Sequence, residues 1–166
     1  MNIIVDGPDG SGKSTLVDFL SEKFNLRKQH LVRLNPGETV EEFYEKFVLN
    51  LKNSDNNIFD RCYFSNIVYS TVFNDSMIVS EKLQEKIFNS IDFVIFCLPT
   101  YNKYIKNFNS LRENRFELYS NMVPVYKGFK ELSNVLKKSE KYIEYNMFED
   151  KIEDIGNKIC WHLVQN

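Results

Sequence analysis

Residues 2–15 read Asn-Ile-Ile-Val-Asp-Gly-Pro-Asp-Gly-Ser-Gly-Lys-Ser-Thr, and this stretch decides the fold. It begins with a short apolar run, Asn2 to Val5, which is typical of a buried parallel strand. Gly7 to Ser14 then fit the pattern G-x-x-x-x-G-K-[ST], and helical periodicity follows from about Lys13 to Phe24. A strand, a glycine-rich turn and a helix in this order predict a loop whose backbone N–H groups bind polyphosphate.

The residue types in this loop each suit that chemistry. Glycines let the backbone curl around phosphates at the positive end of the helix. Lys13 is placed to reach the outer phosphates, and Ser14 offers an oxygen to Mg²⁺. We therefore expect ATP, as a co-substrate, together with Mg²⁺, at Gly7, Gly10, Ser11, Gly12, Lys13, Ser14 and Thr15.

The rest of the chain alternates short apolar runs with helical patterns. Strands are expected at 30–34, 58–60, 92–98 and 142–145, and helices near 40–51, 63–72, 81–88, 101–108, 124–138 and 152–163. Thr39 and Glu42 form a capping box before the first of these helices. Because parallel strands need helical crossovers, the pattern predicts a three-layer α/β fold with about five parallel strands and helices on both faces.

Length and charge limit the function classes. The 166 residues suffice for a single domain spanning residues 1–166. The 21 Lys and Arg against 23 Asp and Glu give a net charge of −2, which argues against binding to nucleic acid and for a small-molecule partner.

The cysteines and the apolar runs indicate a compartment. Cys62, Cys97 and Cys160 form no CxxC pair and are interpreted as reduced thiols. No apolar run is long enough to span a bilayer, and the N-terminus has no secretory pattern. We expect a cytoplasmic protein without a membrane partner.

Four segments, taken in order, resemble the thymidylate kinase family of P-loop nucleoside monophosphate kinases. They are the phosphate loop with Asp9 between its glycines, Asn35 to Thr39, Asp60 to Tyr69, and Arg112 to Glu117. The resemblance implies the P-loop kinase fold and Mg²⁺-dependent phosphoryl transfer from ATP to a deoxynucleoside monophosphate, with dTMP or a related pyrimidine nucleotide as acceptor. It also implies a homodimer built on helices.

The resemblance further implies roles for individual residues. Asp9 would accept a hydrogen bond from the sugar 3′-hydroxyl, and Arg61 would hold both the acceptor phosphate and Asp9. Asp60 would orient water or Mg²⁺, while Ser65 and Tyr69 would line the nucleoside pocket.

Further cations are expected around the transferred phosphoryl group, because fixed positive charge there lowers the barrier. Arg112 and Arg115 lie in a segment, 109–118, that resembles the family's mobile lid. Gly10 stands where some members have an arginine, so the lid is expected to supply the missing cation. Arg33, near the end of the expected second strand, is a further candidate for the acceptor phosphate. The expected catalytic set is Lys13, Asp60, Arg61, Arg112 and Arg115.

One segment departs from the family. Only 20 residues separate Thr39 from Asp60, and no arginine lies between Arg33 and Arg61. Typical members have a longer segment here, with a helix whose Phe and Arg recognise thymine. The aromatic residues of this shorter segment are predicted to be core, so the sequence does not predict which base is accepted.

Three other functions fit parts of the pattern. A deoxynucleoside kinase acting on thymidine or deoxycytidine would need a general base after the second strand, where Asn35 stands with Glu38 nearby. A polynucleotide kinase is disfavoured by the net charge. A non-catalytic ATP-binding protein would not need Lys13 and Ser14 together with Asp60 and Arg61.

Overall fold

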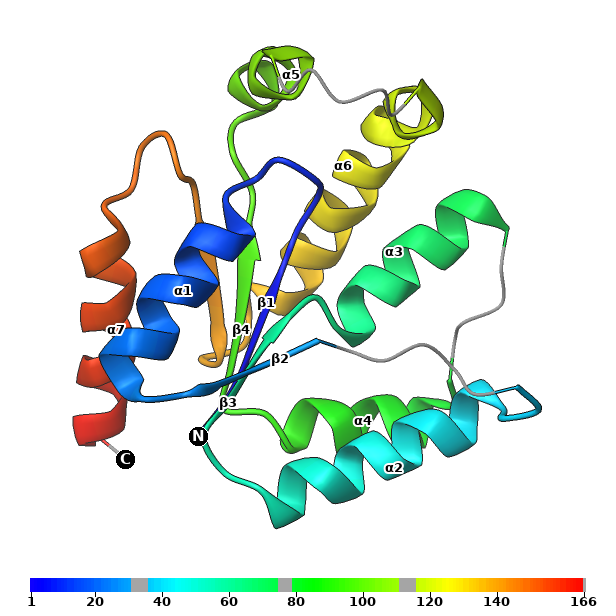
Figure 1. Ribbon diagram of the computed structural model, residues 1–166, viewed down its shortest axis with the longest axis vertical. Helices are drawn as coiled ribbons and strands as arrows, with labels where there is room; N and C mark the ends of the chain where they lie inside the picture. The colour runs from blue at the N-terminus through cyan, green and yellow to red at the C-terminus, as the bar shows by residue number, and fades with distance from the viewer. Residues whose placement is uncertain (31–35, 75–78, 111–115, 166) are drawn as a thin grey trace.

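A computed structural model of the protein describes residues 1–30, 36–74, 79–110 and 116–165, with the backbone alone described at 109–110 and 116–119. In these residues, five parallel strands form one sheet with the order β2-β3-β1-β4-β5 (Figure 1). The strands are β1 (Asn2–Asp6), β2 (Arg27–Gln29), β3 (Asn57–Asp60), β4 (Phe93–Cys97) and β5 (Tyr142–Tyr145). This sheet confirms the predicted fold class.

Helices cover both faces of the sheet. One face carries α1 (Lys13–Phe24) and α7 (Ile152–Gln165), as Figure 1 shows. The other carries α2 (Val40–Asn53), α3 (Tyr63–Phe73), α4 (Glu81–Asn89) and α6 (Phe116–Leu136). The remaining described helix, α5 (Tyr101–Ser110), follows β4 and packs on α6 through a small cluster of Tyr104, Met122 and Tyr126.

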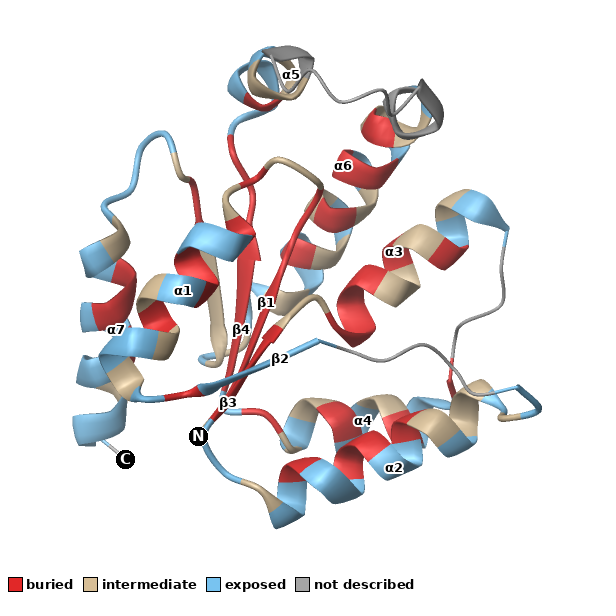
Figure 2. Cartoon of the chain, in the orientation of Figure 1, coloured by how far each residue is buried: buried red, intermediate tan, exposed pale blue. Residues whose placement is uncertain are grey.

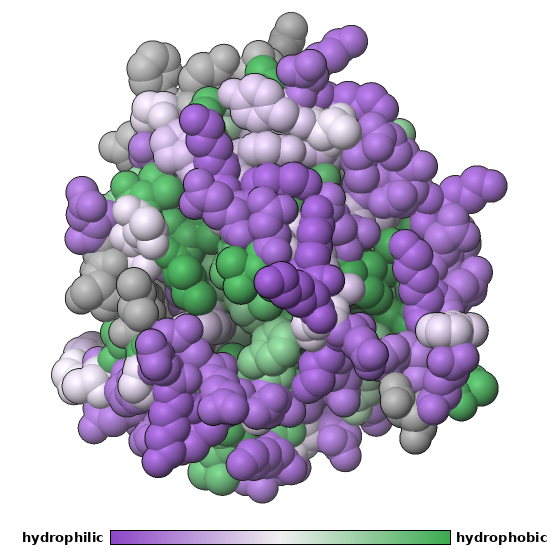
Figure 3. All heavy atoms as spheres, turned by 180° about the vertical axis from the view of Figure 1, so that it is seen from behind, coloured by the Kyte–Doolittle hydropathy of each residue, from purple (hydrophilic) through white to green (hydrophobic). Residues whose placement is uncertain are grey.

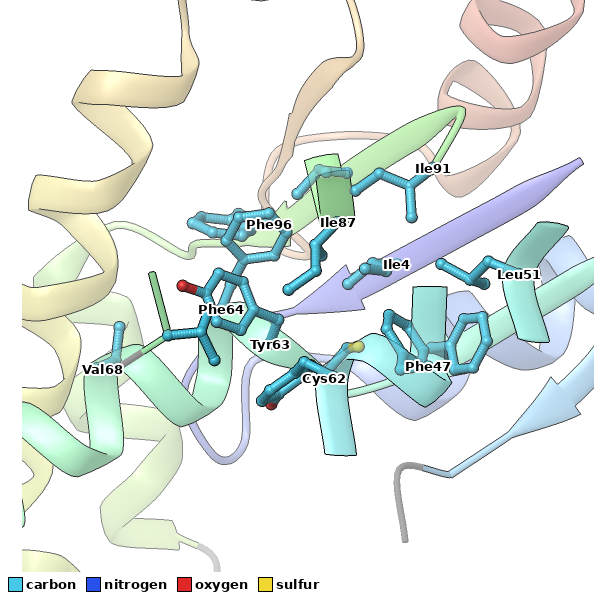
Figure 4. Close-up of a cluster of buried hydrophobic side chains, with 14 of the residues drawn as sticks. Ile4, Phe47, Leu51, Cys62, Tyr63, Phe64, Val68, Ile87, Ile91 and Phe96 are labelled. Atoms are coloured by element: carbon cyan, nitrogen blue, oxygen red, sulfur yellow. The ribbon is translucent and has the colours of Figure 1, made fainter. Parts of the chain in front are cut away.

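The central strands feed two hydrophobic cores, because successive side chains of a strand point to opposite faces. Ile4 packs with Phe64 and Phe96 in the core beneath α2, α3, α4 and α6 (Figure 4). Its neighbours Ile3 and Val5 lie in the second core, against α1 and α7. Every residue of β1 is buried (Figure 2), which explains why the sequence shows a continuous apolar run there.

The expected second strand is misplaced. The sequence predicts it at 30–34, whereas β2 spans Arg27–Gln29 and residues 31–35 lie outside the described part of the chain. β2 is an edge strand whose three residues are all exposed (Figure 2). Such a strand has no apolar pattern, so hydrophobic periodicity cannot locate it.

The predicted start of the helix that corresponds to α6 is also wrong. The sequence predicts a helix that begins at Pro124, but this proline lies inside α6, which begins at Phe116. A proline removes one N–H from the helical ladder. The helix continues because its neighbours Met122, Val125 and Phe129 are all buried.

The outer surface is mostly polar. Seen from behind, hydrophilic residues cover most of the molecule, and smaller hydrophobic areas lie between them (Figure 3). No helix in the described residues is long and apolar enough to cross a membrane. Among the cysteines, Cys62 and Cys97 are buried, Cys160 is exposed, and all three are free thiols.

Candidate active site

A cavity of about 230 Å³ lies at the carboxyl edge of the sheet, beside the start of α1. The segments following β1 and β3 both reach this cavity, because the two strands are neighbours and Val5 pairs with Asp60. Ligands of open parallel sheets bind at this edge. The cavity is lined by Asp9, Gly10, Ser11, Gly12, Lys13, Ser14, Thr15, Asp60 and Arg61.

Two glycines allow the loop to take its shape. Gly7 has φ +146°, and a Cβ there would lie 2.5 Å from the backbone carbonyl oxygen of Cys97. Gly12 has φ +87°, and a Cβ there would lie 2.7 Å from the sulfur of Met147. Both backbones therefore require the absence of a side chain. Since Gly12 is the N-cap of α1 and brings no side-chain cap, the first N–H groups of the helix are left for a ligand.

Lys13 is the buried cation of the loop. Only 6% of the residue is exposed, and its Nζ donates to the carbonyl oxygen of Pro8 at 2.6 Å. Burial, followed by the positive charge of Arg61, lowers the pKa of Lys13 to about 8. The nearby hydroxyl of Ser11 is buried and has no hydrogen-bond partner among the described residues. A buried cation and a buried hydroxyl without a described partner both favour an anionic ligand.

Ser14 and Asp60 provide a pair of oxygen donors. The Ser14 hydroxyl donates to a carboxylate oxygen of Asp60 at 3.1 Å, although the two residues come from α1 and β3. No group of three His, Cys, Asp or Glu residues in the described ranges is arranged to hold a metal. Mg²⁺ prefers few protein oxygens together with phosphate oxygens, so this pair fits a magnesium–nucleotide complex.

Arg61 links the phosphate loop to α3. Its backbone has φ +68°, a conformation that a non-glycine residue rarely adopts. Its guanidinium donates to the Asp9 carboxylate, to the carbonyl oxygen of Gly7 at 3.4 Å, to the Ser65 hydroxyl at 3.3 Å and to the Tyr69 hydroxyl at 3.2 Å. The structure therefore places together Asp9, Arg61, Ser65 and Tyr69, the four residues that the resemblance assigns to the acceptor.

Three expected site residues lie outside the described part of the chain. They are Arg33, Arg112 and Arg115, and Asn35 lies there as well. The described part of α5 does reach the phosphate loop, because Asn107 donates to the carbonyl oxygen of Gly10 at 2.9 Å. The segment expected to form a lid, residues 109–118, thus begins within the last turn of a helix that contacts the loop and ends within the start of α6.

Sequence reasoning missed several residues around this cavity. Asp6 is fully buried at the end of β1. Asn107 donates to the carbonyl oxygen of Gly10, and Met147 packs on Gly12. Asp6 carried a signal, since it is a charged residue that ends a buried strand directly before the phosphate loop. Asn107 and Met147 carried none, because their positions depend on how α5 and the segment after β5 fold back.

The fold matches solved structures over nearly the whole chain. The YorR protein from Bacillus subtilis, in complex with phosphorylated GDP, matches with a TM-score of 0.78 and 21% identity, over 98% of this chain and 95% of that chain. The fold is that of the P-loop nucleotide kinases. No family model matches the sequence, and no curated protein matches it.

Two nucleotide kinases share the fold. Deoxyadenosine kinase from M. mycoides with bound dATP has a TM-score of 0.63 and 20% identity, over 96% of this chain and 98% of that chain. Thymidylate kinase from Candida albicans has a TM-score of 0.59 and 18% identity, over 99% of this chain and 90% of that chain. These similarities concern the fold, and the chemistry is argued from the residues of the cavity.

Proposed function

We propose that the protein transfers the γ-phosphoryl group of ATP to a deoxynucleoside monophosphate, with dTMP or a related pyrimidine nucleotide as acceptor. The observation that carries this proposal is the placement of Arg61. Its guanidinium lies beside the phosphate loop and contacts Asp9, Ser65 and Tyr69. A fixed cation at this place suits a second phosphate group next to the triphosphate.

On the donor side, the loop binds the triphosphate. The free N–H groups at the start of α1 and the Lys13 ammonium hold the outer phosphates. Ser14 and Asp60 would hold Mg²⁺, which, when bound, neutralises charge on the phosphate oxygens. Lys13 and Arg61 flank the position of the transferred group, so that charge developing on its oxygens meets fixed cations.

On the acceptor side, Arg61 binds the monophosphate, and Asp9 both orients Arg61 and accepts a hydrogen bond from the sugar hydroxyl. Tyr69 supports Arg61 from beneath, because the guanidinium carbon lies 5.3 Å from the centre of the tyrosine ring. We assign Arg33 to the acceptor phosphate, and Arg112 and Arg115 to the transferred phosphoryl group, as parts of the same proposal.

Transfer to a deoxynucleoside is the second candidate, and it is favoured by the structural similarity to deoxyadenosine kinase. A sugar hydroxyl is a poor nucleophile and needs a general base, whereas the phosphate of a monophosphate is already ionised. The described carboxylates at the cavity are engaged: Asp9 accepts from Arg61, and Asp60 accepts from Ser14. Asp6 is fully buried and cannot reach a substrate. These contacts support the monophosphate.

The shortened segment after Thr39 forms α2 and then leads into β3. Its aromatic residues Tyr44 and Phe47 are buried in the core, as expected, whereas Phe43 is only partly buried and lines a cavity of about 400 Å³ together with Phe47. Because the YorR structure contains phosphorylated GDP, acceptors with purine bases belong in any test.

The test is a panel of acceptors with purified protein, ATP and Mg²⁺. Pyrimidine and purine deoxynucleoside monophosphates are run beside the corresponding nucleosides, ADP release is followed, and the products are identified by chromatography. We expect a diphosphate product from at least one monophosphate, with Lys13→Ala inactive. Faster turnover of a nucleoside would establish the second candidate, and no ADP release above the Lys13→Ala background would refute both.

The same purified protein and acceptor panel also test the two remaining candidate functions. A non-catalytic ATP-binding protein would be stabilised by ATP without releasing ADP in the presence of any acceptor. A polynucleotide kinase would label the 5′-hydroxyl of an oligonucleotide, which we add to the panel. We expect no transfer to it, since the chain carries a net charge of −2.

A further inference from the structure

The end of β1 carries a carboxylate that the proposed reaction does not use directly. Asp6 is 0% exposed, and it accepts hydrogen bonds from the backbone N–H groups of Cys62 at 3.2 Å and Ser65 at 3.0 Å. Its second oxygen accepts from the Ser65 hydroxyl. All of these donors belong to the corner between β3 and α3, the corner that contains Arg61.

The backbone contacts make Asp6 the cap of α3. The N-cap residue Cys62 brings no side-chain hydrogen bond, so the helix has no cap from its own sequence. Asp6 accepts instead from the backbone of Ser65, the third residue of the helix, as an N-cap side chain would. Its negative charge also lies at the positive end of the helix.

The side-chain contact connects Asp6 to Arg61. A serine hydroxyl has a single proton, and Ser65 donates it to Asp6. The oxygen lone pairs of Ser65 are then available to Arg61, whose Nη1 donates to Ser65 at 3.3 Å, while Nη2 donates to Asp9. The hydroxyl thus relays the buried negative charge to one side of the guanidinium, and Asp9 holds the other.

We propose that Asp6 is a positioning residue, which acts through the Ser65 hydroxyl to hold the Arg61 guanidinium in the orientation that binds the acceptor phosphate. This inference rests on the proposed function, since it assumes that Arg61 meets the acceptor. Burial raises the pKa of Asp6, but the Ser65 hydrogen bond and the Arg61 charge oppose that shift. The charged form of Asp6 is therefore stabilised by Ser65 and Arg61, the same two groups that Asp6 holds in place.

A purely structural role makes different predictions. If Asp6 only caps α3, its loss lowers stability and disturbs the binding of both substrates. If Asp6 orients Arg61, its loss acts on the acceptor, while ATP binding to the phosphate loop changes little. Asp6→Asn separates the two roles, because an amide oxygen still accepts from both backbone N–H groups but the charge is gone.

The experiment compares Asp6→Asn, Ser65→Ala and the double variant with the wild-type protein. We expect each single variant to raise the KM for the acceptor monophosphate about tenfold, the loss typical of one charge-assisted hydrogen bond, and to leave the KM for ATP within about twofold. The double variant should be no worse than the singles, because both changes break the same relay. Asp92→Asn is the matched control, since Asp92 accepts from the backbone of Asn2 at the opposite end of β1.

Three results overturn the inference. They are additive losses in the double variant, equal losses for ATP and acceptor, and an unchanged acceptor KM in Ser65→Ala. Ser65→Ala also decides the matter if Asp6→Asn fails to fold, because it keeps Asp6 and both backbone bonds.

Crystal structures distinguish a failure of the inference about Asp6 from a failure of the proposed function. If the wild-type protein transfers to no acceptor, the proposed function is wrong, and the position of Arg61 still tests the relay. We expect the Arg61 guanidinium to turn about its contact with Asp9 and to leave position 65 in Asp6→Asn and in Ser65→Ala. An unmoved guanidinium in both variants would show that Asp6 does not position it.

Discussion

The hydroxyl of Ser14 lies 3.1 Å from a carboxylate oxygen of Asp60. Ser14 belongs to the first turn of α1, and Asp60 ends β3, so the contact joins the phosphate loop to the strand that leads to Arg61. Two oxygen donors from separate elements meet here because β1 and β3 are adjacent and parallel. The pair is therefore held by the sheet and does not depend on a flexible loop.

Removing either oxygen should weaken the use of Mg²⁺. We expect Ser14→Ala and Asp60→Asn to raise the Mg²⁺ concentration for half-maximal activity at least about tenfold, since even outer partners of metal ligands have effects of this size. The measurement is a Mg²⁺ titration of ADP release at saturating ATP. Ser21→Ala is the control, because Ser21 lies in the same helix and its hydroxyl donates to the carbonyl oxygen of Leu26. Unchanged titrations would remove these two residues from the metal site.

The ion pair between Arg61 and Asp9 predicts a loss specific to the acceptor. Arg61→Lys keeps the charge but loses the planar fork that contacts Asp9, Ser65 and Tyr69 together. We expect kcat/KM for the acceptor to fall about 100-fold, and nucleotide binding to the phosphate loop to persist. Initial rates over a range of acceptor concentrations measure the first, and thermal shift with ADP measures the second.

The control for this pair is Lys103→Ala. Lys103 forms an ion pair with Glu149 at 3.2 Å, and both side chains are about half exposed, at 48% each. Exposed pairs contribute little, so activity should stay close to that of the wild type. Equal losses in Lys103→Ala and Arg61→Lys would mean that general charge, and not the Arg61 contact, governs acceptor binding.

Local signals located most of the fold. The expected capping box of Thr39 and Glu42 is present at the start of α2, and Ser80 caps α4. Both signals are short-range, because the cap and the N–H groups that it satisfies lie within one turn. The sequence predicted the wrong positions for the edge strand β2 and for the start of α6. Strand β2 has no buried face, and α6 continues through Pro124.

In the candidate site, too, local signals located some residues and missed others. The phosphate loop could be found from eight consecutive positions, and Asp60-Arg61 from its place at the end of an expected strand. Asp6 could not be assigned to Arg61 from the sequence, because their link passes through Ser65 and requires the pairing of β1 with β3. Contacts of this kind depend on tertiary packing, which no local pattern encodes.

Gly7→Ala should destabilise the protein by steric overlap. The new Cβ would lie 2.5 Å from the carbonyl oxygen of Cys97, in the backbone of the neighbouring strand β4, which cannot move aside. Gly37→Ala is the matched control, because Gly37 also has a positive φ, +85°, but no atom of the described residues lies within 4 Å of the added carbon. We expect a loss of about 1 kcal/mol for Gly37→Ala from backbone strain, and at least about 1 kcal/mol more for Gly7→Ala. Urea unfolding measures both free energies, and equal losses would contradict the overlap.

The pKa of Lys13, lowered to about 8, predicts that nucleotide binding takes up a proton. Below pH 8 the ammonium is charged and ready to bind phosphate. As the pH rises through 8 the free protein loses this proton, while bound phosphates raise the pKa of Lys13, so binding must restore the proton. We expect Mg²⁺-free ADP to bind more weakly as the pH rises above about 8, by up to tenfold per pH unit, and to take up close to half a proton at pH 8. Calorimetry in buffers of different ionisation enthalpy measures the uptake. It should vanish in Lys13→Arg, whose guanidinium stays charged, and persist in Lys103→Ala. Proton uptake that is unchanged in Lys13→Arg would assign the titrating group to another residue.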